Sequence, residues 1–176
     1  MYETRQGIQL TENFNSSEFA CKCCGRVSID TRLVLKLQEL RDEIDTPIYI
    51  TSGFRCKKHN REVGGARCSL HRYATASDIK FDWSVFPSTK SLVECLTSKF
   101  DGVGLYPKAG TRKLSFVHVD LLPDKNFPLP HFTELEDCAN IEYRRPLYWW
   151  RDWRGHYHYF YDLESFIDFA ENYFKL

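Results

Sequence analysis

The chain has 176 residues, in which 24 Lys and Arg residues balance 24 Asp and Glu residues. This length is enough for one well-packed domain with an appendage and is short for two complete cores. The balanced charge excludes a general electrostatic field that would recruit nucleic acid or an anionic membrane surface. Any binding site must then be local, and we expect a monomer with no nucleic-acid and no membrane partner.

The N-terminal part shows no targeting pattern. Its first ~30 residues lack a positively charged start followed by an apolar run, and no apolar stretch elsewhere is long enough to cross a bilayer. We expect synthesis in the cytoplasm without a signal peptide. "NSSEFACKCCGR" is typical of a short capped turn followed by a cysteine-bearing loop that closes at Gly25.

Seven cysteines are a high and odd number, which in a reducing compartment favours thiols or metal ligands over a disulfide framework. In "CKCCG", Cys21 and Cys24 have the Cys-x-x-Cys spacing of a structural zinc site, but a second such pair is missing. We expect buried free thiols here. A second metal site with Cys56, or a disulfide from this loop to Cys56, is the alternative.

The middle of the chain predicts alternating helices and strands. A helix capped by Asp30 should carry Leu33, Leu37, Leu40 and Ile44 on one face and stop before Pro47. "PIYITSGF" predicts a strand that ends in a glycine turn and delivers Arg55, and a polar loop from Cys56 to Cys68 follows. Strands are then expected at "ATASDIKFD", "GVGLYP" and "LSFVHVDLL", with a helix from Ser88 after the first of them. The pattern indicates an α+β domain with a small, mainly antiparallel sheet and flanking helices.

The C-terminal part is rich in aromatic residues. "LPDKNFPLPHF" predicts an irregular crossing, "RRPLYWWRDWRGHYHYFYD" a hairpin that turns near Arg154 and Gly155, and Asp162 the cap of a closing helix. We assign residues 1–125 to a main domain and residues 126–176 to an extension that packs on its core. The alternative is a sugar- or wall-binding aromatic surface.

Three polar residues on neighbouring segments fit a metal site. A catalytic zinc ion usually takes three protein ligands from His, Asp, Glu or Cys and leaves a position for water. His71 precedes one predicted strand, Asp78 lies within it, and His118 lies in the strand "FVHVD". Because alternate residues of a strand point the same way, Asp120 shares the face of His118.

Four ordered motifs carry a family resemblance. "ITSGFR", "HNREVGGARCSLH", Ala76 with Asp78, and "FVHVD" resemble the zinc D-Ala-D-Ala carboxypeptidase superfamily, peptidase family M15, and within it the phage lysins and murein endopeptidases. The likeness covers roughly residues 10–121. It implies a Hedgehog / D-Ala-D-Ala peptidase-like fold and one catalytic Zn²⁺ held by His71, Asp78 and His118.

The resemblance also implies roles for other residues. Arg55 matches the arginine that holds the carbonyl or carboxylate of the substrate and stabilises the oxyanion, and we add Ser69 and Tyr106 as substrate-binding candidates. In several relatives the general base is an acid three residues before the last histidine ligand, where this chain has Ser115. Asp120 is therefore the candidate base, and its alternative role is to orient a histidine ligand, in which case a Glu or Asp from another loop would supply the base.

The same resemblance implies a loop detail and the class of substrate. Ala74 replaces a usual glycine, and we expect the turn to survive. The implied activity is zinc-dependent hydrolysis of peptidoglycan peptide stems or cross-links, with endopeptidase cleavage favoured over D,D-carboxypeptidase cleavage, at the cell wall or periplasm after release. One alternative is a non-catalytic, zinc-stabilised binding module on the same fold, as in the Hedgehog signalling domain. Another is a cell-wall adaptor that acts through the aromatic tail.

Overall fold

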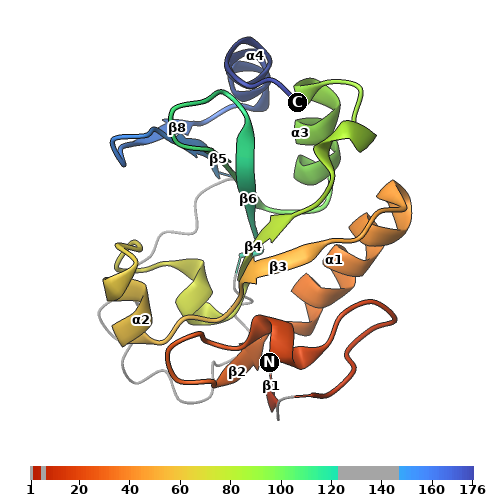
Figure 1. The fold of residues 1–176 in the computed structure, drawn as a ribbon, viewed down its shortest axis with the longest axis vertical. Helices are drawn as coiled ribbons and strands as arrows, with labels where there is room; N and C mark the ends of the chain where they lie inside the picture. The colour runs from red at the N-terminus through yellow and green to blue at the C-terminus, as the bar shows by residue number, and fades with distance from the viewer. Residues whose placement is uncertain (1, 5–6, 123–146) are drawn as a thin grey trace.

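The computed structural model describes residues 2–4, 7–122 and 147–176 of the chain (Figure 1). The helices within these ranges are η1 (Ser16–Phe19), α1 (Thr31–Ile44), α2 (Lys57–Glu62), η2 (Leu70–Tyr73), η3 (Trp83–Val85), α3 (Thr89–Thr97) and α4 (Leu163–Tyr173), where η marks a 3-10 helix. The strands are β1 (Tyr2–Thr4), β2 (Val27–Ile29), β3 (Tyr49–Ser52), β4 (Ala76–Lys80), β5 (Gly102–Pro107), β6 (Leu114–Asp120), β7 (Leu147–Arg151) and β8 (Tyr157–Phe160). None of the described helices has the length and apolar character that crossing a membrane requires.

The main sheet has six strands in the order β3-β4-β6-β5-β7-β8, and β1 pairs with β2 in a separate two-stranded sheet. Neighbouring strands of the main sheet run antiparallel except for β5 and β7, which are parallel. The predicted α+β class with a mainly antiparallel sheet is therefore confirmed. The last two strands are the predicted C-terminal hairpin, which joins this sheet at β5.

Local signals in the sequence explain where the helices begin. The Asp30 carboxylate caps α1 by accepting a hydrogen bond from the Arg32 backbone amide at 2.9 Å. Ser88 caps α3 and Asp162 caps α4 in the same way, through the amides of Ser91 and Ser165. These are the three caps that the sequence predicts.

The hydrophobic core lies on one face of the main sheet. Alternate residues of β5 and β6, Val103, Leu105, Val117 and Val119, are fully buried there with Ile79 of β4. Side chains of α1, α3 and α4 and of Phe174, which follows α4, complete this core; those of the helices are Leu33, Val34, Leu37, Leu40, Leu92, Val93, Leu96, Phe166 and Ala170. Because side chains alternate along a strand, the opposite face of β4, β5 and β6 is free to carry other chemistry.

The structure corrects one prediction from the sequence, and others lie outside the described residues. The segment from Cys56 to Cys68, predicted as a polar loop, contains the six-residue helix α2, whose N-cap is Cys56. The predicted irregular crossing and the predicted domain boundary at residues 125/126 lie almost entirely in residues 123–146, outside the described residues.

Candidate metal centre

The polar face of the sheet gathers the predicted ligands in one row. Asp78 of β4 pairs with His118 of β6, and His118 pairs with Gly104 of β5. The row continues to Trp149 of β7, the partner of Gly104. His71 reaches the same place from η2, the short helix before β4. The structure therefore brings His71, Asp78 and His118 together, and all three are buried.

Three acceptor atoms converge within this cluster. Nε2 of His71 lies 3.1 Å from Oδ1 of Asp78 and 3.1 Å from Nδ1 of His118. Nδ1 of His118 lies 3.0 Å from the same Asp78 oxygen. Three lone-pair atoms this close repel one another unless a proton or a metal cation lies between them. The arrangement is therefore that of a cation site.

Hydrogen bonds on the far side of each ring fix which nitrogen faces the cluster. Nδ1 of His71 lies 2.7 Å from the Gly53 carbonyl oxygen, so Nδ1–H must donate there and Nε2 keeps its lone pair. Nε2 of His118 lies 3.0 Å from Oδ2 of Asp120, which leaves Nδ1 of His118 as the free acceptor. Such outer partners hold histidine ligands in the correct tautomer.

The acid–base properties of the cluster agree with its geometry. Burial alone would lower the pKa of His118, but hydrogen bonds and negative charge from Asp120 and Asp78 raise it to about 9. For His71, burial is the main cause and its pKa falls. Burial would raise the pKa of Asp78, yet the two histidines outweigh it and lower that pKa. One proton is thus held at His118 when no metal competes for the site.

The donor set fits zinc. Donors 2.0–2.1 Å from a tetrahedral Zn²⁺ lie about 3.3 Å from one another, and the cluster already has separations of 3.0 and 3.1 Å. Two imidazoles and a carboxylate also match the ligand types that zinc prefers. These residues could therefore hold the ion with little rearrangement.

Comparison with known families agrees with this geometry. Residues 12–120, more than half of the chain, match the family described as Peptidase M15. The chain belongs to the M15 peptidase family. M15 peptidases are zinc enzymes, so membership supports a metallopeptidase with His71, Asp78 and His118 as its candidate ligands. A comparison with curated proteins finds no match.

Arg55 lies at the edge of the M15 centre. Its Nη2 forms an ion pair with Oδ2 of Asp78, the oxygen that does not face the histidines. Its Nε donates to the Ser52 hydroxyl at 2.9 Å, and its side chain is 14% exposed. The guanidinium is therefore held in a fixed orientation beside the candidate ligands, as a substrate-binding role requires.

The structure places Asp120 behind His118. Its Oδ2 contacts Nε2 of His118, the nitrogen opposite the converging Nδ1. This contact is that of a residue that orients a ligand, the alternative role weighed for it, and its role as general base stays a prediction. Ser115 is half-buried and lies three residues before His118 on β6. Among the described residues, Asp78 and Asp120 are the carboxylates that hydrogen-bond to the histidine pair.

The two further substrate-binding candidates differ in their surroundings. Tyr106 stacks on Phe116 with ring centroids 4.3 Å apart, and its hydroxyl accepts a hydrogen bond from Trp149 Nε1 at 3.3 Å. Burial is the main cause that raises the pKa of Tyr106, so its hydroxyl is neutral. Ser69 precedes η2, the helix that carries His71, and its hydroxyl makes no capping hydrogen bond. Substrate binding by either residue stays a prediction.

Trp149 is a residue of this centre that was not predicted from the sequence. Its ring lies against that of His118, with centroids 5.0 Å apart. The indole occupies the space above Gly104, where a Cβ atom would lie 2.7 Å from Cζ2 of Trp149. The signal was present in "GVGLYP", because Gly102 and Gly104 leave two positions on the polar face of β5 without side chains.

Ala74 has a backbone conformation that glycine adopts more readily than other residues. Its φ of 61° and ψ of 19° lie in the left-handed region, at the end of η2. Its carbonyl accepts a hydrogen bond from the Asp30 amide at 2.9 Å. The expectation that the turn survives the added methyl group is therefore confirmed.

The structure also brings the predicted cysteines together. Cys21, Cys24 and Cys56 form no disulfide, and of these only Cys21 is buried. Burial alone would raise the pKa of Cys21, but backbone amides of Cys56, Cys23 and Cys24 outweigh it and lower that pKa. The alternative of a disulfide to Cys56 is not what the structure shows.

Proposed function

We propose that this chain is a zinc-dependent peptidase that hydrolyses an amide bond in the peptide stems or cross-links of bacterial peptidoglycan, with endopeptidase cleavage favoured over D-Ala-D-Ala carboxypeptidase cleavage. The observation that carries the proposal is the convergence of His71 Nε2, Asp78 Oδ1 and His118 Nδ1 in a buried cluster. M15 membership supports the peptidase class. The likeness of the motifs to phage lysins and murein endopeptidases supports the wall substrate and action at the wall after release.

Each residue of the centre has a defined task in such a reaction. Zinc, when bound, supplies Lewis acidity and lowers the pKa of a water molecule towards about 7. Gly53 and Asp120 hold the two imidazoles so that Nε2 of His71 and Nδ1 of His118 face inward. Asp78 presents one oxygen to the histidines and the other to Arg55. A single carboxylate therefore links the candidate metal ligands to the Arg55 guanidinium.

Arg55 is the candidate for substrate recognition. Peptidoglycan stems contain carboxylates, and a guanidinium binds a carboxylate through paired, charge-assisted hydrogen bonds. In an endopeptidase the same group would donate to the carbonyl oxygen of the bond that is cut, where negative charge develops. Its anchoring by Ser52 and Asp78 means that little conformational freedom is lost on binding.

Digestion of purified peptidoglycan tests the proposal. The zinc-loaded protein is incubated with isolated cell walls, and the released muropeptides are identified by mass spectrometry. We expect cross-linked dimers to become monomers, and we expect His118→Ala to abolish this conversion. Cys95→Ser is the matched control. Cys95 lies in α3, where its thiol donates a hydrogen bond to Glu43, away from the metal centre.

Two results would contradict the proposal in different ways. Release of D-alanine with cross-links left intact would show carboxypeptidase cleavage. Stoichiometric zinc at the histidine cluster with no new peptide product would favour the non-catalytic binding module. Two observations support this binding module as the alternative. Asp120 is hydrogen-bonded to His118, and Ser115 occupies the position of the usual acid.

A further inference from the structure

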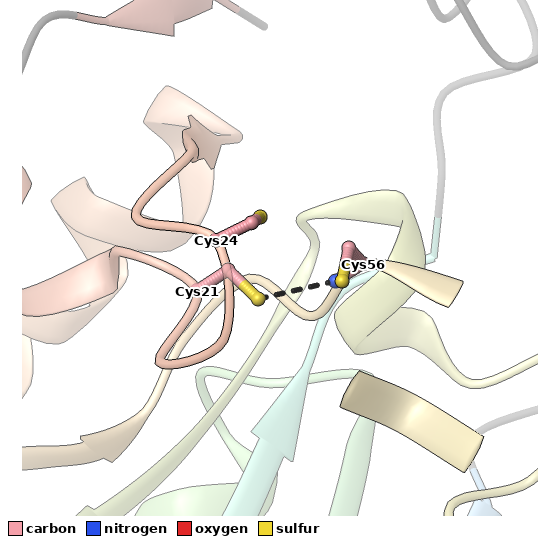
Figure 2. Close-up of side chains that lie close together, drawn as sticks. All are labelled: Cys21, Cys24 and Cys56. Carbon is pink, nitrogen blue, oxygen red and sulfur yellow. Dashed lines mark hydrogen bonds between the residues drawn. The ribbon is translucent and has the colours of Figure 1, made fainter. Parts of the chain in front are cut away.

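A second group of metal-ligand side chains lies outside the histidine centre. The thiol sulfurs of Cys21, Cys24 and Cys56 all lie within 4.8 Å of one another. Figure 2 shows Cys21 and Cys24 on one loop, with Cys56 facing them from a separate segment. The peptidase reaction proposed above uses none of these residues. We propose that the three thiolates form a structural zinc site.

The loop that carries two of these cysteines is tightly closed. The Cys21 amide donates to the Arg26 carbonyl at 2.8 Å, and the Gly25 amide donates back to the Cys21 carbonyl at 2.8 Å. Gly25 supplies the left-handed turn with a φ of 69°. This closure places the thiols of Cys21 and Cys24 on one side of the loop, as the Cys-x-x-Cys spacing of zinc sites requires.

Backbone amides already solvate the sulfurs. The Cys56 amide donates to Cys21 Sγ at 3.4 Å, the contact drawn in Figure 2, and the His59 amide donates to Cys56 Sγ at 3.4 Å. Amide donors aimed at sulfur stabilise negative charge on it, and the thiolate is the form that binds metal. Thiolates 2.3 Å from a tetrahedral Zn²⁺ would lie about 3.8 Å apart, so sulfurs within 4.8 Å of one another need a contraction of at most about 1 Å.

A zinc ion suits this cluster better than a disulfide does. A disulfide would use two of the three sulfurs and leave the third beside it without a partner, whereas zinc engages all three. Cys21 also packs in a small buried cluster with Phe54 and Ala74, with Cys56 against it. The ion would therefore join the N-terminal loop to the segment that follows Arg55 in the chain, beside Ala74 at the end of η2.

This joining has a structural meaning for the histidine centre. The Phe54 amide donates to the Phe19 carbonyl at 2.9 Å, and the Arg55 amide donates to the His71 carbonyl at 3.1 Å. Cys56 is the next residue along the chain. The proposed zinc thus fastens the end of the stretch that supplies both Arg55 and the Gly53 carbonyl beneath His71.

Metal content and a cobalt spectrum test the proposal on the full chain, handled without oxygen and without a disulfide reductant so that the disulfide at Cys68 stays intact. We expect two zinc ions per chain in the wild type and in Cys95→Ser, and one in Cys21→Ser and in Cys56→Ser. Replacing zinc with Co²⁺ should give a near-ultraviolet thiolate-to-cobalt band that persists in His118→Ala. The cobalt band in His118→Ala tests the proposal even if a cysteine variant fails to fold, because this variant keeps all the thiols. Neither readout requires the chain to cleave peptidoglycan.

Three results would contradict the proposed thiolate site. One metal ion per wild-type chain, with no thiolate-to-cobalt band, would overturn the proposal. So would a band that survives in folded Cys21→Ser, because the sulfurs named here would then not be the ligands. A mercurial reagent that blocks thiols should release one of the two zinc ions, and release of none would contradict the assignment.

Discussion

Gly104→Ala should disturb both the sheet and the metal centre, because Gly104 lies directly beneath the Trp149 indole. A Cβ atom at this position would lie 2.7 Å from Cζ2 of Trp149 and nearer still to Cε2 and Nε1. Real Cβ atoms do not approach other atoms this closely, so the indole or the backbone must move. The indole contacts His118 and donates a hydrogen bond to Tyr106, and both contacts would change.

The expected cost follows from these contacts. Overpacking a well-packed site costs about 1–3 kcal/mol, the loss of the Trp149 hydrogen bond about 1 kcal/mol, and a disturbed ring pair about 0.5–1.5 kcal/mol. Alanine recovers about 0.5–1 kcal/mol because glycine in a strand is entropically unfavourable. We therefore expect Gly104→Ala to lower the free energy of unfolding by about 1.5–5 kcal/mol.

Urea denaturation of a double-mutant cycle measures the effect. Trp149→Leu keeps an apolar side chain but lacks the three indole atoms that Cβ would meet. If the clash is the cause, Gly104→Ala should cost far less in the Trp149→Leu background, with a coupling energy of about 1–3 kcal/mol. An equal cost in both backgrounds, or a stabilising effect of Gly104→Ala alone, would refute the placement of Trp149 over Gly104.

Three further outcomes test the centre and its surroundings. Asp120→Ala should weaken zinc binding about 10- to 100-fold while leaving turnover at saturating zinc nearly unchanged; a turnover loss of about 10²–10⁴ at normal affinity would instead make Asp120 the base. In metal-free Cys21→Ser protein, zinc binding at pH 7 should release about one proton, because the pKa of His118 is about 9. Calorimetry in buffers of different ionisation enthalpy counts that proton, and affinity should rise with pH up to about 9. Burial, with the Glu43 carboxylate, raises the pKa of Cys95 to about 11. The alkylation rate of Cys95 should therefore rise between pH 9 and 11, at higher pH than for an ordinary thiol. A pH profile like that of an ordinary thiol would contradict the contact between Cys95 and Glu43.

Local patterns in the sequence were sufficient for much of the fold. The cap at Asp30 and the apolar spacing that follows it specify α1, and the alternation of "FVHVD" specifies which residues of β6 face the core. Helix α2 escaped prediction because its six residues are polar and show no apolar period, and because its cap is Cys56 rather than a usual capping residue.

The metal centre was predictable only in part. The motifs identified His71, Asp78 and His118, and strand alternation placed Asp120 on the face of His118. Alternation does not say which nitrogen of His118 Asp120 contacts, and that contact is the observation that favours an orienting role for Asp120. Trp149 was out of reach because it arrives through a parallel pairing between strands that are far apart in the chain, which no local pattern encodes.

The parallel pairing of β5 with β7 has a consequence for any shortened version of the chain. The family match ends at residue 120, before β7 begins at Leu147. A chain truncated to the matched part would leave β5 as an exposed edge strand with unpaired backbone groups. At Gly102 and Gly104 no side chain would cover those groups. Such an edge is a template for strand addition by a second copy, so truncation should promote self-association.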